Sequence, residues 1–420
     1  MLLPDMSRPA AALFASLVTA LAVAGAGCSG APPRARSSPA RREAAAPAVA
    51  ALRDGRFADS DRVAASVLAG DPDNSGAAAV RALARYREIM ERLWRDLSAV
   101  GAKFDHADGN FDDSTFRAAL IRAEAALADV DRDLARAAAD PDFSLELCIA
   151  CWKQDWNGNG RVDEGDQLLF QVEMDADGHD IPEGDPRRSP TFRFDTGDAH
   201  WARAMVAFQR AGMNLVAAFR WHEADKLAVS LFGSQPQIIR FPLEDAARVR
   251  RARDLLLAGL DHADRSRQAY LAESDDEREW LPSPRQKNHP LPLTVDARLY
   301  DTWDAVIDDV RRLVRGQEGL DMAEIVRLGA PGLRIRPGYL DIGRMLSGPR
   351  DIVIDLPALE KLDRDSPAGL EAALRSFFGA YYVDRMKPSP LVGRLARMRG
   401  EIDRGEDSFG RKLRYLLWLN

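Results

Sequence analysis

The sequence predicts a mainly α-helical protein, built from a helical hairpin and a helical bundle, with an inserted acidic loop segment and few short strands. Two observations predict this fold class. Apolar residues recur every three or four positions over long stretches, which places them on one face of a helix, and runs of β-branched residues are short and rare. With 420 residues, 46% of them hydrophobic and 29% charged, the chain is long enough for two or three globular units with ordinary cores.

The N-terminus carries an apolar segment from Ala11 to Gly27, followed at once by Cys28. This length is typical of a signal peptide and is short for a membrane span. The ending resembles a bacterial lipoprotein signal, in which small residues precede a cysteine that receives lipid and becomes the mature N-terminus. The resemblance implies removal of residues 1–27, lipidation of Cys28 and a place at the outer membrane, facing the periplasm or the cell surface. A plain secretory peptide is the alternative.

The charge and the hydrophobicity of the chain exclude some classes of partner. The formal net charge is -7 and the isoelectric point is near 5.6, whereas nucleic-acid binding would need a basic stripe or domain, so we expect no nucleic-acid partner. No second apolar run approaches bilayer length, so we expect membrane attachment only through the lipid anchor. Residues 28–47 are mostly Pro, Ala, Arg and Ser, which predicts a disordered tether.

Residues 48–140 are predicted to be helical and to begin with a hairpin. Gly55, Phe57 and the Asp-Pro-Asp-Asn turn at residues 71–74 resemble a tetratricopeptide repeat over about 40 residues. The resemblance implies a hairpin that packs on the following helices, because one repeat cannot bury its apolar face alone. A hairpin without a ligand and a hairpin that lines a peptide-binding groove both remain open.

Three longer apolar stripes predict the helices of the bundle. The first runs from Phe116 to Leu134, the second from Trp201 to His222, and the third from Leu299 to Leu313. Charged residues flank each stripe, so we expect these faces to pack on one another. Strands are predicted only at residues 237–241, 333–335 and 351–356, a proline-rich loop is predicted at residues 281–294, and the helical domain is assigned to residues 199–420.

Residues 141–198 form an acidic segment. Between Asp155 and Asp198 there are twelve Asp or Glu and four Arg. Asp195 and Asp198 are expected to cap a helix that begins near Ala199. The other acidic residues form either a solvated loop or a cation site.

The spacing of residues 155–166 favours a cation site. Oxygen-bearing side chains, a glycine that permits a sharp turn and an acidic closing residue occupy the positions that a calcium loop uses. Val162 is expected to pin the loop to a neighbour. The pattern resembles the loops of EF-hand and dockerin-like proteins. The implied ligands are Asp155, Asn157, Asn159, Arg161 through its carbonyl, Asp163 and Asp166.

The closing Asp166 is shorter than the usual glutamate, so Ca²⁺ binding should be weak, on the order of 10⁻⁵ to 10⁻³ M, and Mg²⁺ stays open as an alternative. His179 and Pro182 break the spacing of a second acidic cluster, which either shares an ion or forms a bare acidic turn. That cluster comprises Asp175, Asp177, Asp180, Glu183 and Asp185.

Cys148 and Cys151 stand directly before the calcium-type loop, and outside the cytoplasm we expect them to form a disulfide. A redox site, a haem attachment site and a zinc site each need neighbouring residues that this sequence does not offer.

These features predict a lipid-anchored scaffold or partner-binding protein with a structural calcium ion and an unidentified protein partner. The sequence contains no nucleophile elbow, phosphate-binding loop or His-Glu-x-x-His motif, and we assign no catalytic residue. His200 and His222 would lie about 33 Å apart along one predicted helix, too far to share a metal. The alternative is a periplasmic hydrolase of envelope polymer, with the acidic segment lining its cleft.

Overall fold

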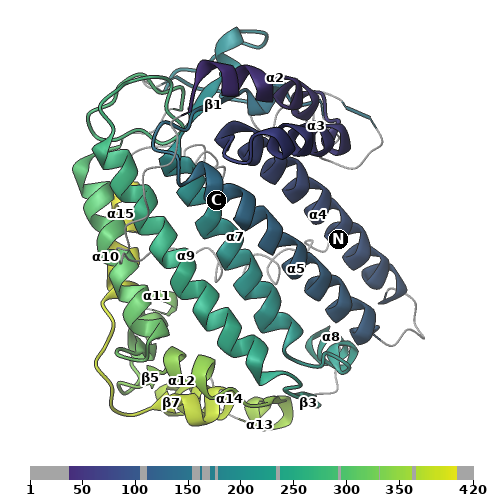
Figure 1. Ribbon diagram of the computed structural model, residues 1–420. Helices are drawn as coiled ribbons and strands as arrows, with labels where there is room; N and C mark the ends of the chain where they lie inside the picture. Colours follow the sequence, from purple (N-terminus) through teal and green to yellow (C-terminus); the bar gives the residue numbers. More distant parts are fainter. Residues whose placement is uncertain are drawn as a thin grey trace.

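The protein is mainly helical in the computed structural model, which confirms the predicted fold class. Four long helices run side by side through the molecule (Figure 1): α4 (Ser75–Phe104), α5 (Asp113–Ala137), α7 (Thr196–Ala217) and α9 (Ala246–Ala272). The structure describes residues 37–104, 111–153, 161–162, 171–175, 178–232, 237–291, 295–330, 332–361 and 366–403.

A helical hairpin, α2 (Pro39–Arg53) and α3 (Phe57–Gly70), packs on α4, as the repeat-like pattern predicts. Gly55 makes the turn between the two helices with a φ of 73°, a left-handed conformation that glycine adopts without strain. A Cβ at this position would also overlap the carbonyl oxygen of Lys153. The turn therefore needs glycine for two independent reasons.

Helix α2 begins inside the segment 28–47 that composition predicted to be a disordered tether. Ser38 caps the helix, because its hydroxyl accepts a hydrogen bond from the Arg41 N–H at 3.3 Å. Pro39 suits the first turn, where its missing N–H costs nothing. Alanine side chains of α2, including Ala45 and Ala48, are buried. The expectation of disorder is therefore wrong from Pro39 onward, where alanine-rich sequence has a capped start and a surface to pack on.

The core of the bundle lies where α5, α7 and α9 meet. Leu127 and Val130 of α5 are buried in a cluster with residues of α7. Gly259 of α9 lies against the ring of Phe208 on α7, and a Cβ at Gly259 would come within 2.6 Å of a ring carbon. The missing side chain therefore lets α7 and α9 approach closely.

The second long stripe is shorter as a helix than the sequence predicted. Helix α7 ends at Ala217, and the chain then turns so that the Arg220 N–H donates to the Pro242 carbonyl and the Trp221 N–H donates to Asp113. His222 lies beyond the end of the helix and is exposed. Its assignment to a buried helical face is wrong, because these tertiary hydrogen bonds replace the helical ones.

Helix α10 (Ala297–Val314) packs on α9 and carries the third predicted stripe. The predicted strand at 333–335 is absent, whereas the other two are present as β3 (Ile238–Phe241) and β6 (Ile352–Asp355), which pair antiparallel. A three-stranded sheet joins β4 (Leu320–Asp321), β5 (Tyr339–Leu340) and β7 (Tyr382–Val383). The remaining α-helices are α8 (Ala224–Phe232), α11 (Met322–Gly329), α12 (Ile342–Ser347), α13 (Leu356–Glu360), α14 (Pro367–Phe378) and α15 (Leu391–Asp403).

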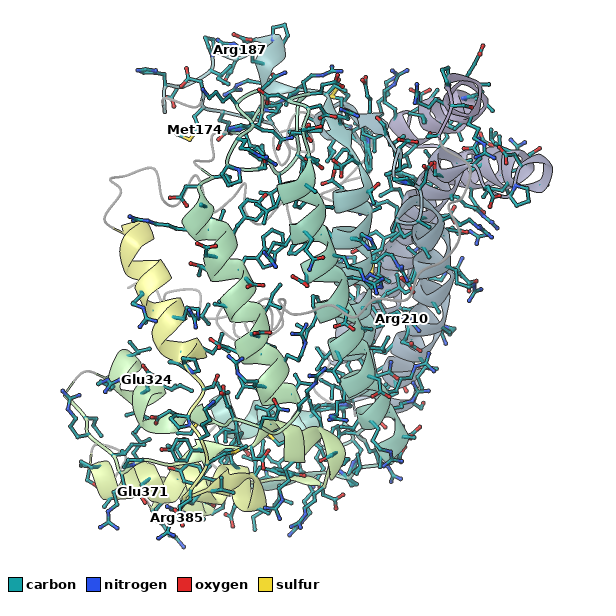
Figure 2. The ribbon with its side chains drawn as sticks, turned by 60° about the vertical axis from the view of Figure 1, so that its left-hand side comes forward. Met174, Arg187, Arg210, Glu324, Glu371 and Arg385 are labelled. Carbon is teal, nitrogen blue, oxygen red and sulfur yellow. A yellow bond between two sulfur atoms is a disulfide. The ribbon has the colours of Figure 1, made fainter. Side chains whose placement is uncertain are left out.

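Two short strands near the ends of the acidic segment, β1 (Leu145–Leu147) and β2 (Phe192–Phe194), pair antiparallel. Figure 2 places Met174 and Arg187 of this segment at the end of the molecule opposite Glu371 and Arg385. The acidic segment and helix α14, which carries Glu371, therefore lie at opposite ends of the bundle.

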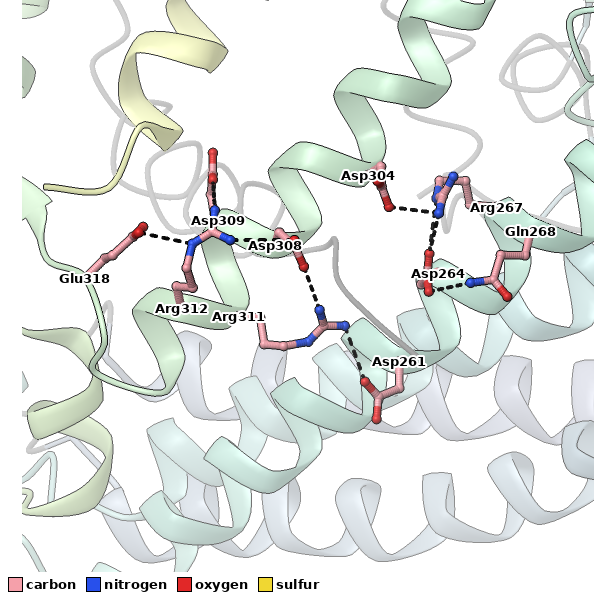
Figure 3. Close-up of polar contacts among 10 residues, drawn as sticks. All are labelled: Asp261, Asp264, Arg267, Gln268, Asp304, Asp308, Asp309, Arg311, Arg312 and Glu318. Atoms are coloured by element: carbon pink, nitrogen blue, oxygen red, sulfur yellow. Dashed lines mark hydrogen bonds and ion pairs between the residues drawn. The ribbon is translucent and has the colours of Figure 1, made fainter. Parts of the chain in front are cut away.

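Ion pairs connect α9, α10 and the turn that follows α10 (Figure 3). Arg311 pairs with Asp261 of α9, and Arg312 pairs with both Asp309 and Glu318. Asp309 and Glu318 are 0% and 1% exposed, so these two carboxylates depend on their basic partners. Within the described part of the chain, no helix is both long enough and apolar enough to cross a bilayer.

Candidate metal centre and its cavity

The candidate site begins at the first turn of α7. Asp195 caps this helix, accepting hydrogen bonds from the N–H groups of Gly197 at 2.6 Å and Asp198 at 3.3 Å. Asp198 reaches back and accepts from the Asp195 N–H at 2.9 Å. This reciprocal pair is a capping box, so both residues cap the helix as the sequence predicted.

Two further carboxylates come from the end of α9 and the segment after it. Glu273 is the C-cap residue that directly follows α9, and Glu279 lies six residues further along the chain. The Arg193 N–H donates to the Arg278 carbonyl at 3.1 Å, which ties the segment after α9 to the strand that precedes α7. Glu279 is 2% exposed as a result.

Asp195, Glu273 and Glu279 therefore converge. One carboxylate oxygen from each lies within 4.8 Å of the other two. Oxygens that ligate one Ca²⁺ at 2.3–2.6 Å are at most about 5 Å apart, so this spacing matches that of ligands around one ion. The three residues, called the acidic triad below, form a group that could bind a metal ion.

Burial and nearby carboxylates disfavour the charged forms of Glu273 and Glu279. Burial raises the pKa of Glu273 far above its ordinary value, and the neighbouring Asp195 carboxylate raises it further. Burial, with Asp195 and Asp275 nearby, raises the pKa of Glu279 to about 7. Glu273 therefore retains its proton in the folded state, and Glu279 is partly protonated near pH 7, unless a cation takes the place of these protons.

Residues behind the acidic triad fix its geometry. The Tyr270 hydroxyl donates to Asp198 at 2.7 Å, and both side chains are buried. A Cβ on Gly197 would lie 2.7 Å from the Tyr270 ring, so the close approach of α7 and α9 at this point requires glycine. The Gln286 amide donates to Glu273 at 3.1 Å and holds that carboxylate in place.

Two members of the acidic triad, Asp195 and Glu273, line a cavity of about 1030 Å³. Asp195 and Glu273 lie on one wall, and Phe143 and Leu145 contribute buried apolar surface. The face of α2 forms another wall, through Arg42, Ala45, Ala46, Val49, Ala50 and Arg53. The hairpin thus contributes a helix face to a cavity, which is the arrangement expected of a groove that binds a partner.

Charged groups of both signs line the cavity. Arg193 is neutralised by Asp275 at 3.0 Å and Glu277 at 2.8 Å. Arg42 and Arg53 are exposed, and within the described part of the chain their guanidinium groups pair with no carboxylate. These two arginines are therefore available to an anionic ligand.

Most of the predicted calcium loop lies outside the described residues. Asp155, Asn157, Asn159, Asp163 and Asp166 fall in residues whose placement is not described, and Arg161 and Val162 are described. Val162 is 48% exposed, so its expected role of pinning the loop to a neighbour is wrong. In the adjacent acidic stretch, Met174 and Asp180 form an isolated antiparallel bridge.

The described part of the second acidic cluster forms turns and caps. Asp175 accepts a hydrogen bond from the His179 N–H at 2.9 Å across a turn that contains Gly178. Asp185 caps the 3₁₀ helix η2 (Pro186–Arg188) and pairs with Arg187. Asp177 lies outside the described residues. Cys148 and Cys151 form a disulfide around the 3₁₀ turn η1 (Ile149–Cys151).

Sequence reasoning missed Glu273 and Glu279. They lie 78 and 84 residues after Asp195, so no local spacing connects them. The only signal was a run of acidic residues directly after a long helix, which is common in solvated helix ends.

The predicted lipidation site, Cys28, lies outside the described residues.

Comparison with known protein families, with characterised proteins and with solved structures found no match to this chain.

Proposed function

We propose that the protein is a lipid-anchored envelope protein that binds a divalent cation, Ca²⁺ in preference to Mg²⁺, at Asp195, Glu273 and Glu279. The cavity beside the acidic triad then receives a partner molecule. The convergence of three carboxylates, two of which line the cavity, carries this proposal. The predicted loop at residues 155–166 remains a second candidate cation site.

The donor set favours calcium. All three ligands are carboxylate oxygens, which suit hard cations. They come from the start of α7, the end of α9 and the segment after α9. Ca²⁺ accepts ligand sets of variable geometry with six to eight oxygens, whereas Mg²⁺ demands a near-ideal octahedron.

Binding of a partner is favoured over hydrolysis. The hydrolase alternative needs acids and a histidine that converge in one pocket. Acids converge here, but none of the described residues that line the cavity is a histidine. Arg42 and Arg53 of α2 line the cavity instead, with no carboxylate partner among the described residues, and such groups recognise anionic side chains or end groups.

The proposed anchor would keep this cavity close to the membrane. Nine positions separate Cys28 from Ser37, the first described residue, and a chain of that length spans at most about 30 Å. Ser37 is hydrogen-bonded to Asp140, next to the cavity wall at Pro141. The partner is therefore expected to be membrane-bound or to act at the membrane surface.

Calorimetric titration of the mature chain with Ca²⁺ tests the cation site. We expect Glu279→Gln to lower Ca²⁺ affinity on the order of 10- to 100-fold, because the variant removes one ligand charge while keeping its shape. Glu277→Gln is the matched control: this carboxylate lines the same cavity, is exposed, and lies outside the acidic triad. Asp155→Ala measures the loop at 155–166 separately. Calcium binding that Asp155→Ala abolishes and Glu279→Gln leaves unchanged would place the ion in the loop and refute the triad.

Fractionation of cells tests the anchor. We expect wild-type protein in the membrane fraction, carrying metabolically incorporated fatty acid, and Cys28→Ser protein without fatty acid. Cys148→Ser with Cys151→Ser is the control, because it removes the other two cysteines and should leave labelling intact. Equal, unlabelled distribution of wild-type and Cys28→Ser protein would instead identify a plain secretory signal.

A further inference from the structure

A pair of histidines lies outside the cavity, between two helices of the bundle. His200 belongs to α7 and His262 belongs to α9, and both side chains are partly buried. Their Nδ1 atoms are 3.3 Å apart. They lie 62 positions apart in the chain, so no local spacing connects them.

The distance between the two Nδ1 atoms can be compared with the distances found in hydrogen bonds and in metal sites. Two imidazoles at 3.3 Å are within hydrogen-bond distance, and which nitrogen donates depends on the tautomers. A tetrahedral Zn²⁺ with Zn–N bonds of about 2.0–2.1 Å holds its ligand nitrogens about 3.3–3.4 Å apart. The two Nδ1 atoms therefore already stand at the distance that one tetrahedral metal ion requires.

The surroundings keep both imidazoles neutral, and neutral imidazole is the form that binds metals. Burial lowers the pKa of His200 to about 4 and that of His262 to about 3, and the charge of Arg203 lowers both further. Arg265 faces the pair as well. Asp131 of α5 holds the Arg203 guanidinium at 2.7 Å and offsets its charge.

Within the described part of the chain, no third His, Cys, Asp or Glu lies close enough to share an ion with both nitrogens. The protein would thus supply two ligands and leave the other positions to water or to a ligand from solution. Open positions of this kind are found in metal sites that bind exchangeable molecules.

We propose that His200 and His262 form a second metal site, which binds an imidazole-preferring divalent transition metal such as Zn²⁺ or Cu²⁺ through the two Nδ1 atoms. The ion would join α7 to α9 a short distance from the acidic triad. The two sites differ in chemistry, because nitrogen ligands suit Zn²⁺ and Cu²⁺ whereas carboxylates suit Ca²⁺. This proposal does not depend on the calcium site.

Titration of chelator-treated full-length protein with Zn²⁺ tests the proposal. We expect one ion per chain, with affinity lowered on the order of 100-fold in both His200→Gln and His262→Gln. His222→Gln is the matched control, since this exposed histidine lies just beyond the end of α7. Thermal unfolding without metal checks that each variant is folded, and Zn²⁺ should raise the melting temperature of the wild type and of His222→Gln only.

A spectroscopic readout separates this site from the carboxylates. Electron paramagnetic resonance of the protein loaded with one equivalent of Cu²⁺ should show coupling to two imidazole nitrogens, and either histidine variant should lose it. Zn²⁺ binding that survives both histidine substitutions but disappears in Glu279→Gln would assign the ion to the acidic triad and overturn the proposal. Absence of Zn²⁺ binding by the wild type would overturn it as well.

Discussion

The cation-free protein is expected to lose stability as the pH rises from 7 to 9, and Ca²⁺ is expected to restore it. The cause is Glu273 and Glu279 of the acidic triad, together with Asp198. Burial raises the pKa of Glu273 and of Asp198 far above that of an exposed carboxyl group, so both keep their protons in the folded chain. In the unfolded chain both are ionised above about pH 5.

The sign follows from proton linkage. The folded state binds more protons than the unfolded state over this range, so the free energy of unfolding falls as the pH rises. Each such group contributes at most about 1.4 kcal/mol per pH unit, and we expect a loss of about 1–3 kcal/mol in total, because local rearrangement relieves part of the repulsion. Glu279, with its pKa at about 7, has lost most of its contribution by pH 8.

Above pH 7 the two buried histidines do not change the pH dependence of the free energy of unfolding. Burial lowers the pKa values of His200 and His262, so these residues stay neutral when folded and take up protons when unfolded. Their contribution makes stability rise with pH up to about 6.5 and is constant above it. The carboxylates therefore determine the slope between pH 7 and pH 9.

Chemical denaturation at pH 7, 8 and 9, with chelator and with Ca²⁺, measures this effect. Ca²⁺ should stabilise the protein more at pH 9 than at pH 7, because it replaces protons that the carboxylates hold. Glu273→Gln should flatten the pH dependence without Ca²⁺, whereas Glu277→Gln, an exposed neighbour, should leave it unchanged. Stability that rises with pH in chelator would contradict the assignment of raised pKa values to this cluster.

Features encoded over a few residues could be predicted from the sequence. The start of α5 at Asp112, the capping box at Asp195 and the glycine turn at Gly55 each depend on neighbours within about four positions, and each is present. The apolar stripes likewise predicted the helices α5, α7 and α10. Helix α2 was missed because composition alone does not reveal that Ser38 caps it and that α3 and α4 cover it.

The candidate site could be predicted only in part. Asp195 was recognised as a helix cap, which is its local role, but its convergence with Glu273 and Glu279 depends on how α7 packs on α9. That packing rests on Gly197 against Tyr270 and on Gly259 against Phe208, close approaches that no spacing rule predicts. The same packing brings His200 to His262. Tertiary contact, rather than sequence motif, thus creates both candidate metal sites.

Replacing Asp309 with alanine is expected to destabilise the protein by about 3–5 kcal/mol. Asp309 is 0% exposed and joins two helices, because it pairs with Arg312 of its own helix α10 at 2.5 Å and with Arg394 of α15 at 3.0 Å. Its removal leaves both guanidinium groups partly buried with one fewer acidic partner. The midpoint of unfolding in urea should fall accordingly, with little change in the slope of the transition.

Asp308→Ala is the matched control, since Asp308 precedes Asp309 on α10 and pairs with the neighbouring arginines (Figure 3). Its side chain is 56% exposed, so water replaces the lost carboxylate and the expected cost is below about 1 kcal/mol. The two residues share residue type, helix and the partner Arg312, whereas Asp309 is buried and also pairs with Arg394 of α15, so the comparison measures the buried, bridging carboxylate against an exposed one. Equal losses in the two variants would mean that helix propensity or net charge dominates. A loss below about 1 kcal/mol for Asp309→Ala would show that the ion pairs of this carboxylate stabilise the protein by no more than the free energy that its desolvation costs.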